Sequence, residues 1–430
     1  MNPPSADTAQ TEFAALIGLD WGHGSHALAL QIRGAATETS TLDHSAENLH
    51  QWLDQLEKRC GGQPVAVAIE ASQGAAVYAL LERPWITLYP IHPATSTRHR
   101  AAFRPSGAKD DTPDALVLLS LLQQHRDRLR PLQSEDEATR TLARLVEARR
   151  KAVDRRTLLS NQLQSTLRDY FPQALELIGD HLAAPLALDF LEKWPRLTDV
   201  QAAKTPTLKN FYQRHNVRRP ELIESRVQRI RAARLLTRDA AVIEVAVRVV
   251  RLLVAELRVL QEHIAEFESA IAQAFAAHPE KHLFRELPGA GAVLAPRLLV
   301  AFGAVRDRFA DASAMQRYFR VAPVTERSGG RAWVHWRWNA PRFVRQTLVE
   351  WAGQTVVYCP WAKAYYEQQR AKRAGHWAIL RALAFKWLRI LWRCWQKSEP
   401  YDQEKYLRQL AQRRSPIAAL ARQFAKQMAA

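Results

Sequence analysis

The feature that most constrains the fold of this chain is a seven-residue repeat of apolar residues between positions 243 and 274. One apolar position of the repeat holds Ile243, Val250, Leu257, Ile264 and Ile271, and the other holds Ala246, Leu253, Leu260, Phe267 and Ala274. Apolar residues at this spacing line one side of a helix, and five consecutive heptads are typical of a coiled coil. The repeat therefore predicts a helix of about 40 residues, which spans about 60 Å.

A second, less regular apolar pattern runs from about 135 to 170, and prolines punctuate the segment between the two patterns. Together they predict a helical coiled-coil domain at 131–280: a long helical hairpin with an inserted cap of short helices and loops at about 172–221. The length of the hairpin favours self-association, into a dimer or tetramer. An internal hairpin without a partner is the alternative.

Before this hairpin, strand and helix patterns alternate. The order is strands at 13–21, 26–32 and 37–42, a helix at 45–60, a central strand at 64–70, a helix at about 74–83, a strand at 85–91, a basic loop, and a helix at about 112–126. This order predicts an α/β sheet with an antiparallel start and a parallel finish. We expect it to form a domain at 13–130, behind a disordered tail at 1–12.

The last third of the chain carries the excess positive charge. Residues 281–430 hold 27 Lys and Arg against 9 Asp and Glu, and the whole chain has a formal net charge of +18. Nine of the 13 tryptophans lie in the same segment, where aromatic and arginine side chains can stack on bases. Some, such as Trp387 and Trp395, fit a helical core instead. We predict a mainly α-helical nucleic-acid-binding domain at 281–396 and a helical basic tail at 397–430, with a solvated basic surface as the alternative.

Several classes of protein are disfavoured. The three cysteines are far apart and lack CxxC spacing, which argues against a disulfide framework or a zinc finger and fits a reducing cytosol. No apolar run approaches the roughly 18 residues of a membrane span, and the first residues lack a signal pattern. We therefore expect a soluble cytoplasmic protein that associates with the nucleoid and not with a membrane.

Four carboxylates fall where a metal site could form. Asp20 ends the first strand, Glu70 ends the central strand, and Asp111 and Asp114 lie three residues apart at the start of the next helix. Carboxylates at the ends of neighbouring parallel strands converge, and their oxygens suit Mg²⁺, or Mn²⁺. Two such ions can activate a nucleophile and stabilise the leaving oxygen of a phosphodiester. Each residue taken singly can also be a strand end or a helix cap.

The motif LPGAGAVLAPRLL at 287–299 places Gly289 and Gly291 before a helix that contains Arg297. Backbone N–H groups at such a turn can hold a phosphate, and the motif looks like half of a helix-hairpin-helix DNA element. A plain turn at a helix start explains the glycines equally well. Arg297 and the positive charge of the domain favour the phosphate interpretation.

The acidic motifs GLDWG, AIEAS and KDDTPDA resemble those of the DEDD insertion-sequence transposases, whose catalytic domain has a RuvC-like, ribonuclease-H fold. The third motif of that family reads roughly Lys-Thr-Asp-x-x-Asp-Ala, so Asp110 is the alternative to Asp111 in this chain. FRVAPVTERSGGR at 319–331 is similar to the C-terminal signature of the same family, whose proposed nucleophile corresponds to Ser328. The resemblance covers nearly the whole chain in order: acidic domain, coiled coil, serine domain.

This resemblance implies a transposase that exchanges DNA strands through a transient phosphoserine at Ser328, while the four carboxylates hold Mg²⁺. Arg327 and Arg331 flank the serine and can neutralise phosphate charge. The implied partners are donor and target DNA and a structured guide RNA. A metal-dependent, structure-specific nuclease such as a junction resolvase, and a non-catalytic nucleic-acid-binding scaffold, remain as alternatives. A sugar-kinase-like interpretation of GLDWG lacks a second phosphate motif.

Overall fold

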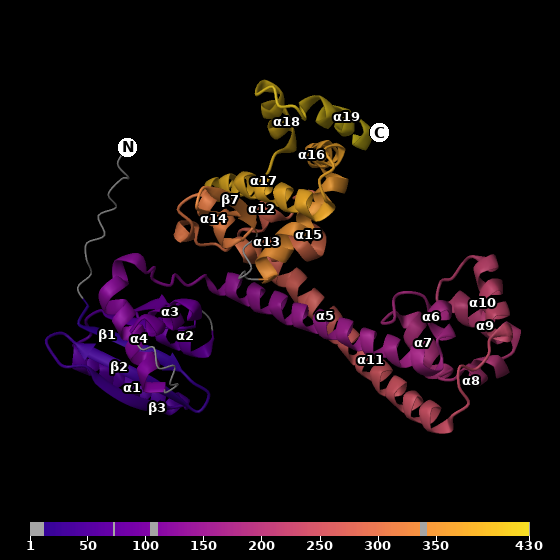
Figure 1. Ribbon diagram of the computed structural model, residues 1–430, viewed down its shortest axis with the longest axis horizontal. Coiled ribbons are helices and arrows are strands. Elements are labelled where there is room, and N and C mark those ends of the chain that lie inside the picture. The colour runs from indigo at the N-terminus through magenta and orange to yellow at the C-terminus, as the bar shows by residue number, and fades with distance from the viewer. Residues whose placement is uncertain (1–12, 72–73, 104–110, 336–341, 430) are drawn as a thin grey trace. The chain divides into compact units, whose positions relative to one another are not determined.

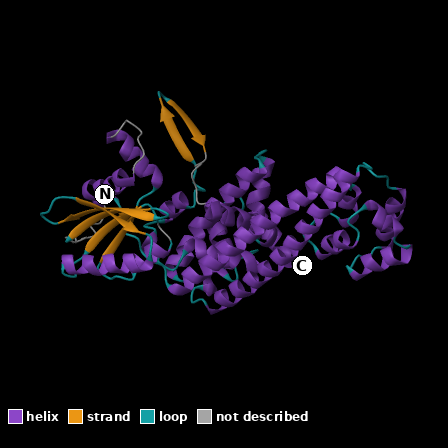
Figure 2. Cartoon of the chain, turned by 90° about the horizontal axis from the view of Figure 1, so that it is seen from below, coloured by secondary structure: helices purple, strands orange, loops and turns teal. Residues whose placement is uncertain are grey.

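The computed structural model describes residues 13–71, 74–103, 111–335 and 342–429, without the side chains of residues 103, 111–113 and 429. The chain divides into two compact units, Met1–Ser134 and Glu135–Ala430. Figure 1 shows strands and helices in the first unit, and almost only helices in the second. In Figure 2 the strands are orange and the helices purple.

The first unit is built on a five-stranded sheet. Its strands are β1 (Ala15–Trp21), β2 (Ser25–Ile32), β3 (Glu38–Asp43), β4 (Val65–Ile69) and β5 (Ile86–Pro90), in the spatial order β3-β2-β1-β4-β5. Its helices are α1 (Ala46–Cys60), α2 (Ala75–Leu81), α3 (Pro93–Phe103), α4 (Asp111–His125) and the short η1 (Arg126–Arg128). Strand β2 pairs antiparallel with β1 and β3, and β4 pairs parallel with β1 and β5. The predicted α/β sheet, with its antiparallel start and parallel finish, is confirmed.

The two faces of the sheet have different partners. Along β1, Ile17 and Leu19 lie in a core with residues of α1 and α2, whereas Gly18 contacts α4. A Cβ atom at Gly18 would overlap the carbonyl oxygen of Ala115 and lie 2.6 Å from the backbone nitrogen of Leu119. Glycine is therefore needed here for the close approach of the helix to the strand.

The prediction for residues 93–103 is wrong: these residues form helix α3 and are not part of a loop. The sequence PATSTRHRAAF has no apolar stripe, so apolar periodicity could not reveal the helix. Polar contacts attach it. His99 Nε2 lies 3.2 Å from Ser120 Oγ of α4, and the side chains of Ser96 and Arg100 bind carboxylates.

The described residues of the second unit form helices and one β-hairpin. Its two longest helices are α5 (Glu137–Tyr170) and α11 (Ala240–Ala277), and between them lie α6 (Gln173–Ile178), α7 (Pro185–Lys193), α8 (Leu197–Ala202), α9 (Thr205–Arg214) and α10 (Pro220–Ala232). After α11 come α12 (Lys281–Phe284), α13 (Gly291–Phe302), η2 (Arg306–Arg308), α14 (Ala312–Tyr318), β6 (Val324–Ser328), β7 (Arg331–His335), α15 (Arg342–Tyr358), α16 (Pro360–Ala371), α17 (His376–Lys397), α18 (Gln403–Gln412) and α19 (Ala418–Ala429).

Helices α5 and α11 lie side by side (Figure 1). Residues of the heptad repeat are buried along α11, among them Val250, Leu257, Ile264 and Ile271. One core contains the short helices α6–α10 together with parts of α5 and α11, and a second core joins the start of α5 and the end of α11 to the helices after residue 281. The predicted helical remainder of the chain is confirmed; coiled-coil self-association stays a prediction.

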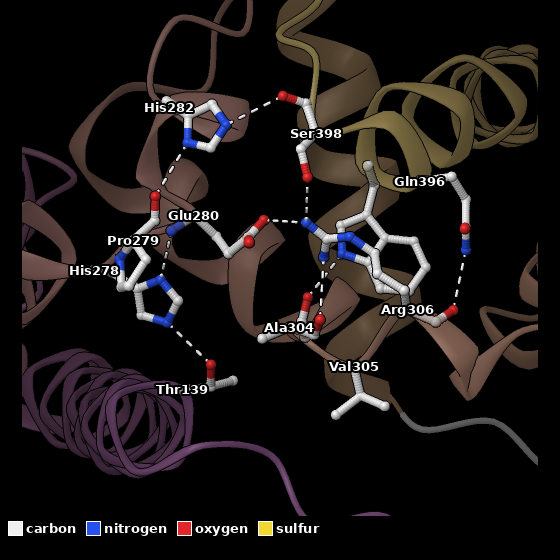
Figure 3. Close-up of polar contacts among 12 residues, drawn as sticks. Thr139, His278, Pro279, Glu280, His282, Ala304, Val305, Arg306, Gln396 and Ser398 are labelled. Atoms are coloured by element: carbon white, nitrogen blue, oxygen red, sulfur yellow. Dashed lines mark hydrogen bonds and ion pairs between the residues drawn. The ribbon is translucent and has the colours of Figure 1, made fainter.

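A polar network ties the start of α5 to the segments that follow α11 (Figure 3). The buried His278 has its Nε2 3.0 Å from Thr139 Oγ1, and its Nδ1 accepts the backbone N–H of Glu280 at 3.1 Å. Burial lowers the pKa of His278 and so favours the neutral ring. In the same network, Arg306 binds the carboxylate of Glu280 and donates to Ser398 Oγ at 3.2 Å.

The described C-terminal residues after Lys397 contain the expected helices, α18 and α19, but they do not form a free tail. Helix α19 packs against α16, and Ile417 and Ala421 belong to the core of this region. Trp387 and Trp395 are fully buried, as predicted, and their Nε1 atoms donate to Thr355 Oγ1 at 3.0 Å and to the Gly303 carbonyl at 2.8 Å. Within the described ranges, no helix is both long enough and apolar enough to cross a membrane.

Candidate active site

The parallel pairing of β1 and β4 brings the first two predicted carboxylates together. The register pairs Leu19 with Ile69, and Asp20 and Glu70 are the next residues along their chains. Because side chains alternate between the two faces of a sheet, Asp20 lies on the same face as Gly18, which is the face that α4 covers. Continuing the register places Glu70 beside Asp20 on this face. The two residues therefore follow paired positions at the carboxyl ends of adjacent strands.

Helix α4 brings the other two acidic positions toward the same end of the sheet. Its Ala115 contacts Gly18 in the middle of β1, whereas residues later in the helix share a core with Phe13, which precedes β1. Helix α4 therefore runs opposite to β1. Its first turn, which contains Asp111 and Asp114, lies toward the carboxyl end of the strand.

Helix α3 supplies polar partners for two of these carboxylates. The hydroxyl of Ser96, itself buried, donates to Glu70 Oε1, and Arg100 forms an ion pair with Asp114. Ser96 and Arg100 are four residues apart and so share one face of the helix. Sequence reasoning missed both residues because it assigned this segment to a loop.

The oxygen donors of this site suit a hard divalent cation. Among the described residues, however, no three His, Cys, Asp or Glu side chains are grouped closely enough to hold a metal ion. Asp110 and the side chain of Asp111 lie outside the described residues, and Asp114 is paired with Arg100. In this structure the positive charge next to the Asp114 carboxylate therefore comes from Arg100, and a bound metal ion would take over this role.

The predicted nucleophile lies at the tip of the β-hairpin in the second unit. Ser328 ends β6 and pairs with Arg331 of β7, and Gly329 and Gly330 between them have φ angles of 53° and 79°. Two consecutive residues with positive φ form a type I′ turn, which glycine adopts without strain. The tight turn leaves the serine exposed to solvent.

The pairing of the hairpin decides which side chains lie near Ser328. Directly paired residues share a face, and so do alternate residues of one strand; Ser328, Arg331 and Trp333 therefore lie on one face. Arg327 points to the opposite face, so Arg331 is the arginine beside the hydroxyl. Trp333 is 47% exposed, which leaves its ring free to stack on a base.

Within the described residues of the hairpin, no histidine is positioned to take the proton of Ser328. His335 Nε2 lies 2.7 Å from Glu326 Oε1, so it already has a carboxylate partner. His335 is four positions along β7 from Arg331, the partner of Ser328, which amounts to about 13 Å along a strand. The histidine of the described hairpin is therefore not placed to act as the base for Ser328.

The turn at 289–291, predicted to bind phosphate, also contributes to the packing of the helices around it. Gly289 has a φ of 70°, and a Cβ atom there would lie 2.9 Å from the Cβ of Gln354 on α15. Gly291 begins α13, with a φ of 54° and open space around it. Arg297 donates through Nε to Thr347 Oγ1 at 3.1 Å, and burial lowers its pKa. Gly289 thus serves helix packing, while Gly291 and Arg297 remain candidates for phosphate binding.

Both halves of the chain match known families. Residues 17–172 match the DEDD transposase family of IS110, and residues 281–367 match the transposase family IS116/IS110/IS902. The chain is 28% identical over 406 residues to the mini-circle putative transposase for IS117 of Streptomyces coelicolor, an alignment that covers 92% of this chain and 97% of that protein. It is 25% identical over 386 residues to the insertion element IS110 uncharacterized 43.6 kDa protein of the same organism, with 88% and 93% covered. It is 30% identical over 206 residues to the putative transposase y4uE of Sinorhizobium fredii, with 47% and 57% covered. The chain therefore belongs to the IS110/IS116 family of transposases and is of the DEDD type.

Proposed function

We propose that this transposase exchanges DNA strands through a transient phosphoserine at Ser328, with Mg²⁺ held by Asp20, Glu70, Asp111 and Asp114. The observation that carries the proposal is the register of β1 and β4, which makes Asp20 and Glu70 neighbours on the face covered by the acidic start of α4. The proposal makes the active site composite: the carboxylates come from the first unit and the serine from the second, of the same or of another subunit.

When bound, Mg²⁺ supplies positive charge that polarises the scissile phosphate and favours the ionised serine. Asp20 and Glu70 offer oxygen ligands from adjacent strands, and Asp114 becomes a ligand once Arg100 leaves it. The released guanidinium stays near the site because α3 is anchored by Ser96 and His99. It can then bind a phosphate oxygen and stabilise the charge that develops during the reaction.

At the hairpin, Ser328 Oγ attacks the phosphorus of a DNA phosphodiester. A phosphorus–serine oxygen bond forms, the bond to the leaving sugar oxygen breaks, and the hydroxyl proton passes to that leaving oxygen or to solvent. Arg331 shares the face of Ser328 and can neutralise a phosphate oxygen, while Trp333 can stack on a neighbouring base. Attack by the sugar hydroxyl of another strand then reverses the step and rejoins the DNA without net hydrolysis.

The partners that we propose are donor and target DNA, a structured guide RNA and a second copy of the chain. The basic last third supports contact with either nucleic acid, and pairing with a guide would choose the sequence without many base-reading side chains. Self-association is supported by an exposed apolar stripe on α11 with heptad spacing: Val245, Leu252 and Val259 are 61%, 59% and 54% exposed.

Covalent trapping tests this function. The protein, with the RNA that co-purifies with it, is mixed with a DNA duplex of its element and Mg²⁺, denatured and digested. We expect DNA attached to the peptide that contains Ser328, no adduct with Ser328→Ala or Asp20→Ala, and a normal adduct with Ser313→Ala, a change at an exposed serine of α14.

The alternatives give different results. A hydrolytic nuclease would cleave DNA without an adduct and would tolerate Ser328→Ala. A binding scaffold would neither cleave nor join DNA, and Asp20→Ala would leave its function intact. Recovery of only random cellular RNA with the protein would remove the guide from the proposal.

A further inference from the structure

A cavity of about 130 Å³ lies in the second unit, where α5, α11 and α13 meet. Arg149 and Arg150 of α5 and Arg297 of α13 line it, over a floor made mainly of apolar side chains. Glu268 of α11 is the one acidic residue among the described residues that line it. The lining therefore has three arginines and one glutamate, while Asp154 and Glu350, just outside the lining, pair with Arg150 and Arg297.

Each of the three arginines is fixed by a partner and keeps further donors. Arg149 binds Glu268 Oε1 through Nε at 3.0 Å and Nη2 at 2.6 Å, and Arg150 Nε lies 3.1 Å from Asp154 Oδ1. Arg297 uses Nε and Nη1, whereas its Nη2 is buried and has no hydrogen-bond partner among the described residues. A guanidinium has five N–H donors, and a buried donor without an acceptor costs free energy. Arg149 and Arg150, which line the cavity, therefore keep donors that an acceptor inside it can use.

The charges next to the cavity are mixed, and the start of a helix adds a positive end to them. Burial lowers the pKa of Arg297, its ion-pair partner Glu350 raises it, and the neighbouring Arg150 and Arg149 lower it. Ala292 and Val293, in the first turn of the twelve-residue helix α13, line the same cavity. The N–H groups of a first helical turn have no partner within the helix and carry the positive end of its dipole.

We propose that this cavity binds a phosphate group of the nucleic acid on which the transposase acts. Guanidinium groups and a helix start are both established partners of phosphate oxygens, and the volume is several times that of one water molecule. The inference rests on the proposed function in one respect, since it assumes a nucleic-acid substrate. The cavity lies outside the hairpin that carries Ser328, so its role is to hold the nucleic acid and not to cleave it.

Two variants and one control separate this site from general attraction to the basic surface. Ala272→Leu places a larger side chain at an exposed position that lines the cavity and leaves every charge in place. Arg149→Gln removes one charge from the cavity. Arg155→Gln removes the same charge from an exposed position on the same helix, outside the cavity.

The first measurement uses inorganic phosphate as the probe, with the melting temperature of the full chain as the readout. We expect saturable stabilisation of the wild type and of Arg155→Gln, and at least about ten-fold weaker binding in Ala272→Leu and Arg149→Gln. The second measurement is the salt dependence of binding to a DNA duplex. Its slope should fall by about one in Arg149→Gln if the bound phosphate belongs to the nucleic acid.

Equal phosphate binding in the wild type and in Ala272→Leu, or no saturable binding at all, would overturn the proposal. Phosphate binding with an unchanged salt slope in Arg149→Gln would also overturn it, because the cavity would then take only the free ion. These outcomes do not depend on an adduct at Ser328. A lack of phosphate binding in the cavity and a lack of phosphoserine chemistry are therefore detected by different experiments.

Discussion

The close contact between β1 and α4 predicts that Gly18→Ala damages the acidic site, which is formed by Asp20, Glu70, Asp111 and Asp114. This is expected although Gly18 has no side chain of its own. The new Cβ would overlap Ala115 O and lie 2.6 Å from Leu119 N, where a comfortable contact is about 3.5 Å. Both atoms belong to the backbone of α4, so no side chain can turn aside. The helix has to withdraw by about 0.9 Å or more, and we expect this overpacking to cost about 1–3 kcal/mol.

Native-state hydrogen exchange of the amides in β1 and β4 measures this cost within the first unit. We expect their opening free energy to fall by about 1–3 kcal/mol in Gly18→Ala, and Mn²⁺ binding to weaken because Asp111 and Asp114 move with α4. The control is Gly24→Ala: a Cβ there meets nothing within 4 Å, so both readouts should match the wild type. Equal exchange and equal Mn²⁺ binding in the two variants would refute the argument that α4 is fixed against Gly18.

Three further predictions follow from particular contacts. Arg100→Gln leaves Asp114 without its ion pair, so the chain should melt at a lower temperature without metal and gain more from Mg²⁺ than the wild type does; Arg98→Gln, an exposed change on the same helix, should do neither. Because the pKa of His278 is lowered in the folded chain, its imidazole takes up a proton at a higher pH in the unfolded chain than in the folded chain. The unfolding free energy should therefore fall as the pH drops below about 6.5, and His278→Gln should flatten that slope in denaturant titrations from pH 7.5 to 5. Trp333→Ala should weaken binding of single-stranded DNA by about 1–3 kcal/mol in fluorescence anisotropy if its exposed ring stacks on a base.

The sequence was most informative where burial produces a regular pattern. The apolar runs around Ile17 and Val67, with the alternating run at 26–32, predicted the mixed sheet and the pairing of β1 with β4, which Asp20 and Glu70 follow. The heptad repeat predicted α11 because one side of the helix is buried at intervals from Ala246 to Ile271. Both features follow from the burial of apolar side chains away from water. Buried positions recur every second residue in a strand and about every 3.6 residues in a helix, so they leave a regular pattern in the sequence.

Features that depend on polar contacts or on three-dimensional closeness could not be predicted in this way. Helix α3 has no apolar stripe, so the sequence did not predict it. The roles of Ser96 and Arg100, each of which binds a carboxylate of the candidate site, were therefore missed. Arg327 and Arg331 are equivalent in the sequence, and only the strand pairing shows that Arg331 shares the face of Ser328. The arginines of the cavity were missed, apart from Arg297, because they come from helices far apart in the chain.

The proposed chemistry requires Ser328 to meet the carboxylates of the first unit in the complex with nucleic acid. The direct measurement is the relaxation enhancement between Mn²⁺ in the acidic site and a nitroxide at Ser328→Cys, in a chain whose other cysteines are replaced by alanine. The account predicts a separation of no more than about 15 Å in the DNA-bound assembly, because two-metal chemistry requires contact of both with one phosphate. Separations of several tens of ångströms in every pairing of subunits would contradict it and would leave a protein that binds nucleic acid without this chemistry.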